Sequence, residues 1–270
     1  MLTVDSEVVL LQPNSFVIPP KSEFGFEVVY RPLLAKEENA KITLKSPELG
    51  EFVYPLRLVG NPTTLQRTLA FKTNLGNDIT QTFKFIHYGK KGTVYNCRVE
   101  KIGQKAPVNV DPKAKAPVVT GDFTVETATV NAPAADNFEG VEVGVNVRFE
   151  PSGLNESSSQ LIVTSNDGGE YLCILNGLTT PPQPKGPFKM AGAKPPPIDF
   201  KNPFFDAYEF TVRIDNPAFT SSVKSPVKID GKKTLSINIT YKAVPGYSSN
   251  GRLIISAGDM PAWVFYLQGE

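Results

Sequence analysis

The side chains that could do chemistry in this chain are few, with one histidine and two cysteines among 270 residues. His87 alone cannot hold zinc, and acid–base catalysis would need a positioned partner that no neighbouring motif supplies. Phe83, Phe85 and His87 alternate along one expected strand, so they share a face. This spacing favours a histidine at the rim of a core, and no catalytic residue is predicted.

The two cysteines also have a structural interpretation. Cys97 lies between Tyr95 and Val99 in an alternating run, and Cys173 occupies an inward slot of its strand. Buried thiols of this kind behave as small apolar residues, and two are too few for a structural zinc site on their own. The sequence predicts two reduced core thiols and no metal.

Several loops match ligand-binding motifs only in part. Residues 89–92, Gly-Lys-Lys-Gly, lack the second half of a P-loop, and residues 166–170 lack the alternating acidic ligands of a calcium loop. Residues 246–251 lack the glycine spacing of a nucleophile elbow. Lys232 and Lys233 form a basic turn that is expected to be solvated. No cofactor and no enzymatic activity are predicted.

The elements that position these residues come from one repeated pattern. An aromatic anchor is followed twelve residues later by an apolar triplet, and ten residues after that by an aromatic that opens an alternating set. Each copy ends at a glycine, Gly60, Gly177 or Gly269. Shared spacing indicates a shared module. The predicted core aromatics are Tyr30, Phe52, Phe149, Tyr171, Tyr241 and Trp263.

Alternation within the copies predicts strands. Residues 143–149 and 235–241 place apolar and polar side chains on opposite faces, which is typical of a sheet with one solvated face. Such a sheet needs a second sheet over its apolar face. We therefore predict an all-β fold of tandem, seven-stranded, immunoglobulin-like sandwiches. The middle copy has expected strands at 67–74, 79–88, 93–100, 121–126, 140–150, 159–165 and 170–176.

Domain boundaries follow from the repeat. The sequence predicts the later part of a sandwich at 1–62, a complete sandwich at 63–180 and another sandwich at 181–270, with further polypeptide expected upstream of Met1. Residues 103–119 are expected to form a mobile surface loop. Prolines between copies favour stiff, extended connections, which suggests a semi-rigid rod. These linker prolines are Pro62, Pro181, Pro182, Pro184 and Pro187.

Composition excludes several classes of function. The chain has 28 basic and 27 acidic residues and a formal charge of +1, so it lacks the basic footprint of a nucleic-acid binder. No apolar run approaches the length of a membrane span, and the first residues do not resemble a secretory signal. Neither nucleic acid nor a membrane is a predicted partner.

Particular runs resemble a known family. Residues 140–151, Gly168-Gly169-Glu170-Tyr171, the stretch 181–188 and Asp215-Asn216-Pro217-Ala218-Phe219 are similar to the hydin-like ASH repeats, immunoglobulin-like modules related to major sperm protein. The resemblance implies a cytoplasmic protein of the ciliary axoneme, within the large assembly of the central pair. Ala243, where the other copies carry proline, departs from this pattern. No enzymatic residue carries over.

The leading hypothesis is a non-enzymatic scaffold that supports ciliary motility. The resemblance implies other axonemal and central-apparatus proteins as partners, with microtubules as a further candidate. Exposed strand edges could pair with extended partner segments. Two alternatives stay open at this point. The strand pattern alone also permits an extracellular or periplasmic adhesion or chaperone module, or accessory domains of a larger enzyme.

Overall fold

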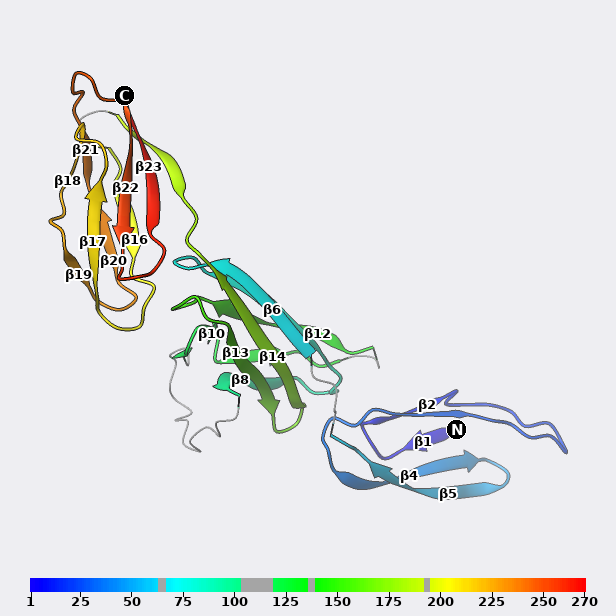
Figure 1. Ribbon diagram of the computed structural model, residues 1–270. Coiled ribbons are helices and arrows are strands. Elements are labelled where there is room, and N and C mark those ends of the chain that lie inside the picture. The colour runs from blue at the N-terminus through cyan, green and yellow to red at the C-terminus, as the bar shows by residue number, and fades with distance from the viewer. Residues whose placement is uncertain (63–66, 103–118, 136–138, 192–194) are drawn as a thin grey trace.

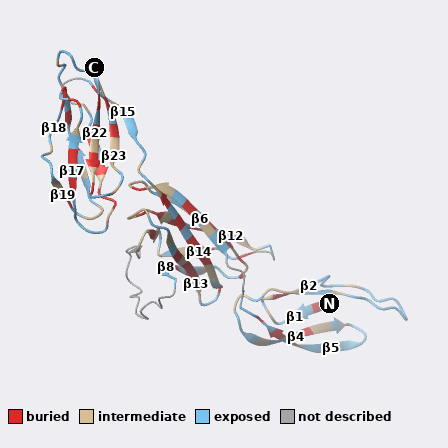
Figure 2. Cartoon of the chain, viewed as in Figure 1, coloured by how far each residue is buried: buried red, intermediate tan, exposed pale blue. Residues whose placement is uncertain are grey.

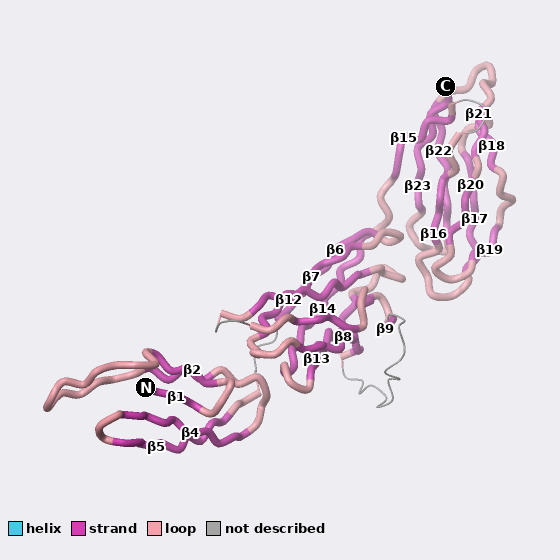
Figure 3. The backbone as a smooth tube through the Cα atoms, turned by 180° about the vertical axis from the view of Figure 1, so that it is seen from behind, coloured by secondary structure: helices cyan, strands magenta, loops and turns pink. Residues whose placement is uncertain are grey.

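The protein consists of strands and loops in three successive β-sandwiches. A computed structural model describes residues 1–62, 67–102, 119–135, 139–191 and 195–270. Within these ranges there is no helix, as the view from behind also shows (Figure 3). The sandwiches follow one another in an extended row from the N-terminus to the C-terminus (Figure 1). The all-β, immunoglobulin-like fold predicted from alternation is confirmed.

The second sandwich is the fullest copy. One sheet has the order β7-β12-β10-β9 and the other the order β11-β8-β13-β14-β6, in which β6 runs parallel to β14. The strands are β6 (Arg67–Asn74), β7 (Ile79–His87), β8 (Thr93–Lys101), β9 (Val119–Thr120), β10 (Phe123–Val125), β11 (Thr129–Ala132), β12 (Val141–Phe149), β13 (Ser157–Ser165) and β14 (Gly169–Thr180). All seven predicted strands are present, and the prediction missed two short edge strands, β9 and β11.

The third sandwich repeats this plan. Its main sheet has the order β15-β23-β22-β17-β19, with β15 parallel to β23, and two short pairs, β16-β20 and β18-β21, form the facing layer. The strands are β15 (Lys185–Met190), β16 (Ile198–Lys201), β17 (Tyr208–Ile214), β18 (Phe219–Ser221), β19 (Val227–Ile229), β20 (Thr234–Ile237), β21 (Ile239–Tyr241), β22 (Asn250–Ser256) and β23 (Trp263–Gly269). The predicted run 235–241 is therefore divided at Asn238.

The first sandwich has fewer strands. A three-stranded sheet, β1-β4-β5, faces the pair β2-β3. The strands are β1 (Leu2–Val4), β2 (Val9–Gln12), β3 (Glu27–Tyr30), β4 (Glu37–Ser46) and β5 (Gly50–Val59). In this sheet β5 lies at the end of the order, so it pairs with β4 on one side only among the described strands.

Three hydrophobic clusters lie between the paired sheets, as the buried residues show (Figure 2). The second and third clusters are large, and the first contains only six buried residues. One buried residue packs in the core of the neighbouring sandwich: Leu75, directly after β6 in the second sandwich, belongs to the cluster of the third. The boundaries at 62/63 and 180/181 remain predictions. The expected loop 103–119 lies almost wholly outside the described residues.

Each complete copy ends at a glycine because its anchor aromatic lies directly against that backbone. A Cβ atom at Gly177 would lie 2.4 Å from the ring of Phe149, and one at Gly269 would lie 2.4 Å from the ring of Tyr241. Real Cβ atoms do not approach other heavy atoms so closely, so a larger residue would displace the aromatic. The repeated glycine therefore follows from the packing of the repeated anchor.

The predicted core aromatics take different positions. Phe149 and Trp263 are buried, and Tyr30, Tyr171 and Tyr241 are half-buried against their clusters. Phe52 is not a core residue, since 42% of it is exposed. Phe52 lies on the same face of β5 as Leu56, which packs against the first cluster, so the predicted alternation is correct. However, β5 lies at a sheet edge opposite a layer of only two strands. The aromatic face of β5 therefore lacks the cover that its counterparts have.

Candidate functional site at the junction of the second and third sandwiches

His87 has a structural role in the second sandwich. Its ring is buried, with Nδ1 2.8 Å from the Tyr95 hydroxyl and Nε2 3.0 Å from the Lys91 carbonyl oxygen. The Tyr95 hydroxyl also lies 2.9 Å from the carbonyl oxygen of Gly168. These contacts tie the β7–β8 turn to the β13–β14 turn. Both ring nitrogens thus have partners inside the fold, which supports the interpretation of His87 as a residue at the rim of the core.

Both cysteines are free and buried, as predicted. Burial raises the pKa of the Cys97 thiol to about 12 and that of Cys173 to about 11. A thiol that stays protonated near neutral pH is a poor nucleophile and a poor metal ligand. In the described part of the chain, no three His, Cys, Asp or Glu side chains gather as metal ligands would. Nor does that part hold a helix long and apolar enough to cross a membrane.

The most developed arrangement of side chains joins the second sandwich to the third. Leu75 follows β6 and is almost fully buried in the hydrophobic cluster of the third sandwich. The indole Nε1 of Trp263 on β23 donates a hydrogen bond to the Leu75 carbonyl oxygen at 3.1 Å. Leu154, in the loop before β13, packs against the same cluster. One sandwich thus contributes to the core of the next.

Gly76 makes this contact possible. Its φ is +92°, a conformation that side chains with a Cβ atom rarely adopt, and a Cβ atom there would lie 2.8 Å from Trp263 Nε1. The turn that carries Leu75 can therefore pass under the indole only because residue 76 is glycine.

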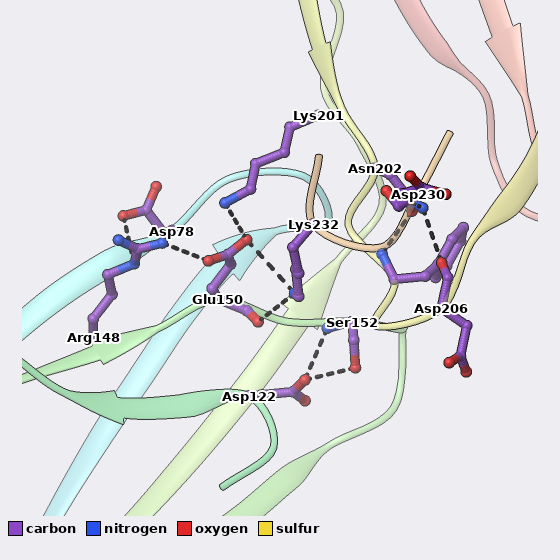
Figure 4. Close-up of polar contacts among 11 residues, drawn as sticks. Asp78, Asp122, Arg148, Glu150, Ser152, Lys201, Asn202, Asp206, Asp230 and Lys232 are labelled. Carbon is purple, nitrogen blue, oxygen red and sulfur yellow. Dashed lines mark hydrogen bonds and ion pairs between the residues drawn. The ribbon is translucent and has the colours of Figure 1, made fainter. Parts of the chain in front are cut away.

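A charged cluster also joins the second sandwich to the third (Figure 4). Glu150, directly after β12, lies with one carboxylate oxygen 2.7 Å from Lys201 Nζ and 3.5 Å from Lys232 Nζ, both of the third sandwich. Its other oxygen accepts a hydrogen bond from Arg148 at 2.5 Å, and Arg148 in turn lies 3.3 Å from Asp78. Glu150 is thus an acidic centre that two lysines of the next sandwich reach.

The contacts of the cluster change the pKa values of Glu150 and Lys232. Burial alone would raise the pKa of Glu150, but hydrogen bonds from Lys201 and Arg148 and the charge of Lys232 together lower it. Burial lowers the pKa of Lys232, and the attraction of Glu150 and Asp122 opposes this only in part. The pKa of Glu150 is lowered, as for an ion pair, but the pKa of Lys232 is lowered as well. The reason is that burial destabilises the charged Lys232 more than its 3.5 Å contact with Glu150 stabilises it. Glu150 is the group whose charge the junction stabilises.

Asn202 connects the end of β16, where Lys201 lies, to the turn that carries Lys232. Its side chain is fully buried, and its amide donates to the carbonyl oxygens of Asp206, Ile229 and Asp230 at 3.0, 2.9 and 3.2 Å. Its own Oδ1 accepts from the Phe204 amide at 2.9 Å. These hydrogen bonds within the third sandwich therefore hold the segments that present Lys201 and Lys232 to Glu150. Lys232 forms its acidic contact within this chain and is not the solvated turn that the sequence predicted.

The linker between these sandwiches is short and held at its start. Only residues 181–184 separate β14 from β15. The amide of Asn74 donates to the Pro181 carbonyl oxygen at 3.0 Å, and Lys185 donates to the side chain of Asn77 at 3.1 Å. The predicted linker prolines Pro62, Pro181 and Pro184 are exposed, Pro182 is half-buried, and Pro187 is an exposed residue of β15. The connection is therefore restricted by contacts as well as by proline.

Sequence reasoning did not identify the junction residues. Leu75 and Gly76 lie between the predicted strands 67–74 and 79–88, and Glu150 is the last residue of the predicted strand 140–150. One signal was present, since Leu75-Gly76-Asn77 places an apolar residue in a turn where polar residues are usual. The partners of Leu75 lie 188 residues away, at Trp263, and no local pattern links them.

The fold and this junction define a class of protein, namely tandem immunoglobulin-like sandwiches joined by a built interface. Over 266 residues, 95% of the chain, it is 32% identical to the hydrocephalus-inducing protein homolog of Homo sapiens and also 32% identical to the hydrocephalus-inducing protein of Mus musculus. The chain is therefore a hydin-like sequence. It spans about 5% of the length of each of these relatives.

Solved structures show more distant likeness. The ASH/PapD-like domain 7 of human CEP192 matches 63% of the chain and 96% of its own length, with 10% identity and a TM-score of 0.32. The CupB2 chaperone of Pseudomonas aeruginosa matches 76% of the chain and 97% of its own length, with 12% identity and a TM-score of 0.29. No family model matches the chain. The fold assignment therefore depends on the chain's own sheets.

Proposed function

We propose that this chain is part of a non-enzymatic structural scaffold of the motile-cilium axoneme, in the central-pair apparatus, where it binds neighbouring axonemal proteins. Similarity to hydrocephalus-inducing proteins over 95% of the chain supports the assignment, as does the resemblance of its repeats to ciliary ASH modules. The protein would act in the cytoplasmic space of the cilium, within a large assembly, and support motility.

The junction carries the structural part of this proposal. A scaffold must hold its domains in a fixed relative orientation, whereas tandem domains with small interfaces move relative to one another. Leu75 in the core of the third sandwich, the Trp263 hydrogen bond and the Glu150 cluster together hold two sandwiches in one relative orientation. An array of such units presents surface loops and strand edges at fixed spacings, so several modest contacts can act together.

Expression of the tagged protein in motile ciliated cells tests the assignment. We expect the protein along the axoneme, and proximity labelling should tag central-pair proteins more strongly than outer-doublet proteins. Cosedimentation of the purified chain with microtubules then distinguishes direct tubulin contact from attachment through other proteins. The chain has two N-glycosylation sequons, Asn155-Glu156-Ser157 and Asn238-Ile239-Thr240. Secretion of the protein with glycans on these asparagines, or uniform cytosolic signal in ciliated cells, would contradict the ciliary proposal.

A further inference from the structure

Two sheet edges lie close together at one margin of the second sandwich. β7 is the last strand of one sheet, β6 is the last strand of the other, and a short turn joins them. Among the described strands each pairs on one side only, β7 with β12 and β6 with β14. They are nine and eight residues long. Open edges of this length are sites where another strand pairs readily.

The even-numbered residues of β7 direct their backbone groups to the open edge. On β12, the Asn146 carbonyl oxygen accepts a hydrogen bond from the amide of Glu126, just after β10. Backbone groups alternate in direction along an antiparallel strand, so the odd-numbered residues of β12 face β7. Val145 pairs with Phe83 in the register, and the odd-numbered residues of β7 therefore face β12. The carbonyl oxygen of Lys84 points the other way, out of the sheet.

Side chains from the two edge strands bond to each other's carbonyl oxygens. The guanidinium of Arg67 on β6 donates a hydrogen bond to the Lys84 carbonyl oxygen of β7 at 2.8 Å. In return, the side-chain amide of Gln81 on β7 donates to the Ala70 carbonyl oxygen of β6 at 2.7 Å. Each edge thus supplies a donor to the other.

Tyr171 on β14 adds a third contact at the same margin. Its hydroxyl donates to the Ile86 carbonyl oxygen at 2.7 Å. Lys84 and Ile86 are successive outward-facing positions of β7, because they are two residues apart. Two neighbouring acceptors of this edge are therefore already bonded within the sandwich.

Arg67 and Gln81 occupy positions where apolar residues would be expected. Arg67 shares the inward face of β6 with Phe71, and Gln81 shares that of β7 with Phe83, since each pair is separated by an even number of residues. A polar group turned toward a core is stable only where it finds a hydrogen-bond partner. The contacts across the margin supply those partners, and they explain why the two inward positions are polar.

The third sandwich protects its corresponding edge with other residues. β15 has the place of β6, and it carries Pro187 together with Lys185 and Lys189, all exposed. Proline and lysine at an edge strand disfavour pairing with another strand. β6 contains no proline, and the charge of Lys84 on β7 is paired with Glu142 at 2.7 Å. The margin of the second sandwich therefore depends on its hydrogen bonds for protection.

We propose that Arg67 and Gln81 close this margin of the second sandwich against strand addition. The partner that they exclude is a second copy of the chain, whose β7 would pair antiparallel with β7. Two identical edge strands related by a two-fold axis can satisfy each other's backbone groups. Such pairing needs the Lys84 carbonyl oxygen, which is bonded to Arg67. The inference depends on contacts within one sandwich and is independent of the ciliary assignment.

The double variant Arg67→Ala, Gln81→Ala of the whole chain tests the proposal. We expect it to self-associate about tenfold more tightly than the parent chain in sedimentation equilibrium, because pairing no longer requires two hydrogen bonds to break. Hydrogen exchange then locates the interface. The amides of Thr82, Lys84 and Ile86 face the open edge, so they should exchange about tenfold more slowly as the concentration of the variant rises.

Two further variants separate loss of the contacts from loss of residues. Arg98→Ala with Gln160→Ala removes the same residue types from β8 and β13, which lie inside the other sheet, and should leave self-association unchanged. Arg67→Ala alone changes an exposed residue and should give a smaller increase by the same mechanism. The amide of Phe83, which faces β12, reports whether each variant remains folded.

Two results would overturn the proposal. One is self-association of both Arg67→Ala variants no tighter than that of the parent chain, with the Phe83 amide still protected. The other is tighter association that leaves the amides of Thr82, Lys84 and Ile86 exchanging as fast as in the parent chain, because the copies would then meet at another surface.

Discussion

The first and second sandwiches carry the same spaced residues, yet they differ in what covers those residues. Phe149 and the inward-facing β14 side chains Cys173 and Leu175 are enclosed by two full sheets, whereas Phe52 and Tyr54 are 42% and 53% exposed. The junctions differ in the same direction. Between the second and third sandwiches an apolar side chain enters a core. Between the first and second, the described contacts are an exposed ion pair, a half-buried cation–π contact and the Leu33 carbonyl against Gly169. The comparison shows that the repeated pattern determines where the strands lie. It does not determine whether the inward-pointing side chains of those strands are buried.

The contacts of the first junction are individually weak. Lys91 lies 3.4 Å from Glu7, with 82% and 62% of these side chains exposed, and the guanidinium of Arg31 lies 4.9 Å from the centre of the Tyr88 ring. An exposed ion pair contributes about 0–1 kcal/mol. The Arg31–Tyr88 contact is half-buried, and a cation–π contact of this kind contributes about 0.5–2 kcal/mol. We therefore expect the first junction to be more compliant than the second.

Alanine substitutions at corresponding aromatics test the difference most strongly. Phe149→Ala should lower the free energy of unfolding of the second sandwich by about 3–5 kcal/mol, as large-to-small core changes do. Phe52→Ala should cost less than about 1 kcal/mol in this chain, as surface changes do. Hydrogen exchange of the β12 and β4 amides, followed in increasing urea, measures each copy separately. Equal losses of unfolding free energy for the two variants would show that Phe52 is as well buried as Phe149.

Leu75→Ala tests whether the second junction is part of a core. The substitution should destabilise the third sandwich by about 2–5 kcal/mol, although residue 75 precedes that sandwich by many residues. Solution scattering should also show a broader distribution of distances between the two sandwiches. Leu178→Ala is the matched control, because Leu178 is an exposed leucine of β14. If both variants scatter like the parent chain, Leu75 does not hold the junction.

The sequence predicted what depends on local pattern. Alternation located all seven expected strands of the second sandwich, and the shared offsets placed Phe149 and Trp263 in cores. The same offsets misplaced Phe52. Burial of a side chain depends on the strand that faces it, and the period of its own strand says only which way it points.

The junction could not be predicted for a related reason. Trp263 matched the core pattern, but its indole hydrogen bond goes to Leu75, in a turn of another copy. The turn 230–233 looked like a solvated basic loop, because the Glu150 that Lys232 approaches lies 82 residues away. Contacts between copies depend on the relative orientation of whole sandwiches, which periodicity does not encode.

Glu150→Gln should weaken the second junction by a smaller amount. The carboxylate is partly buried and accepts charge-assisted hydrogen bonds, each of which contributes about 1.5–3 kcal/mol at most. Partial exposure and the retained amide reduce the expected loss to about 1–2 kcal/mol. Glu142→Gln, in β12, the strand that ends just before Glu150, but in an exposed ion pair with Lys84, should change little. An equal response of the two variants in the stability of the third sandwich would show that Glu150 is an ordinary surface residue.

Acid should reproduce the effect of Glu150→Gln. The pKa of Glu150 is lowered in the folded chain, so the unfolded chain binds its proton first as the pH falls. The stabilisation is complete above the ordinary glutamate pKa, near 4.5, and is lost as the pH falls through the lowered value. Scattering between pH 7 and pH 3 should show the two sandwiches separating only at the acid end. The Glu150→Gln variant should show a weaker pH dependence over the same range.

Lys91→Ala should have the smallest effect. The ion pair between Lys91 and Glu7 is exposed on both sides, so its loss should change stability by no more than about 0.5 kcal/mol. Raised salt should likewise leave the first junction nearly unchanged, because screening removes little from a pair that contributes little. Urea unfolding of the first sandwich and scattering at low and high salt measure both effects. A loss comparable to that of Leu75→Ala would show that the first junction is held as firmly as the second, and the contrast between the two regions would then be wrong.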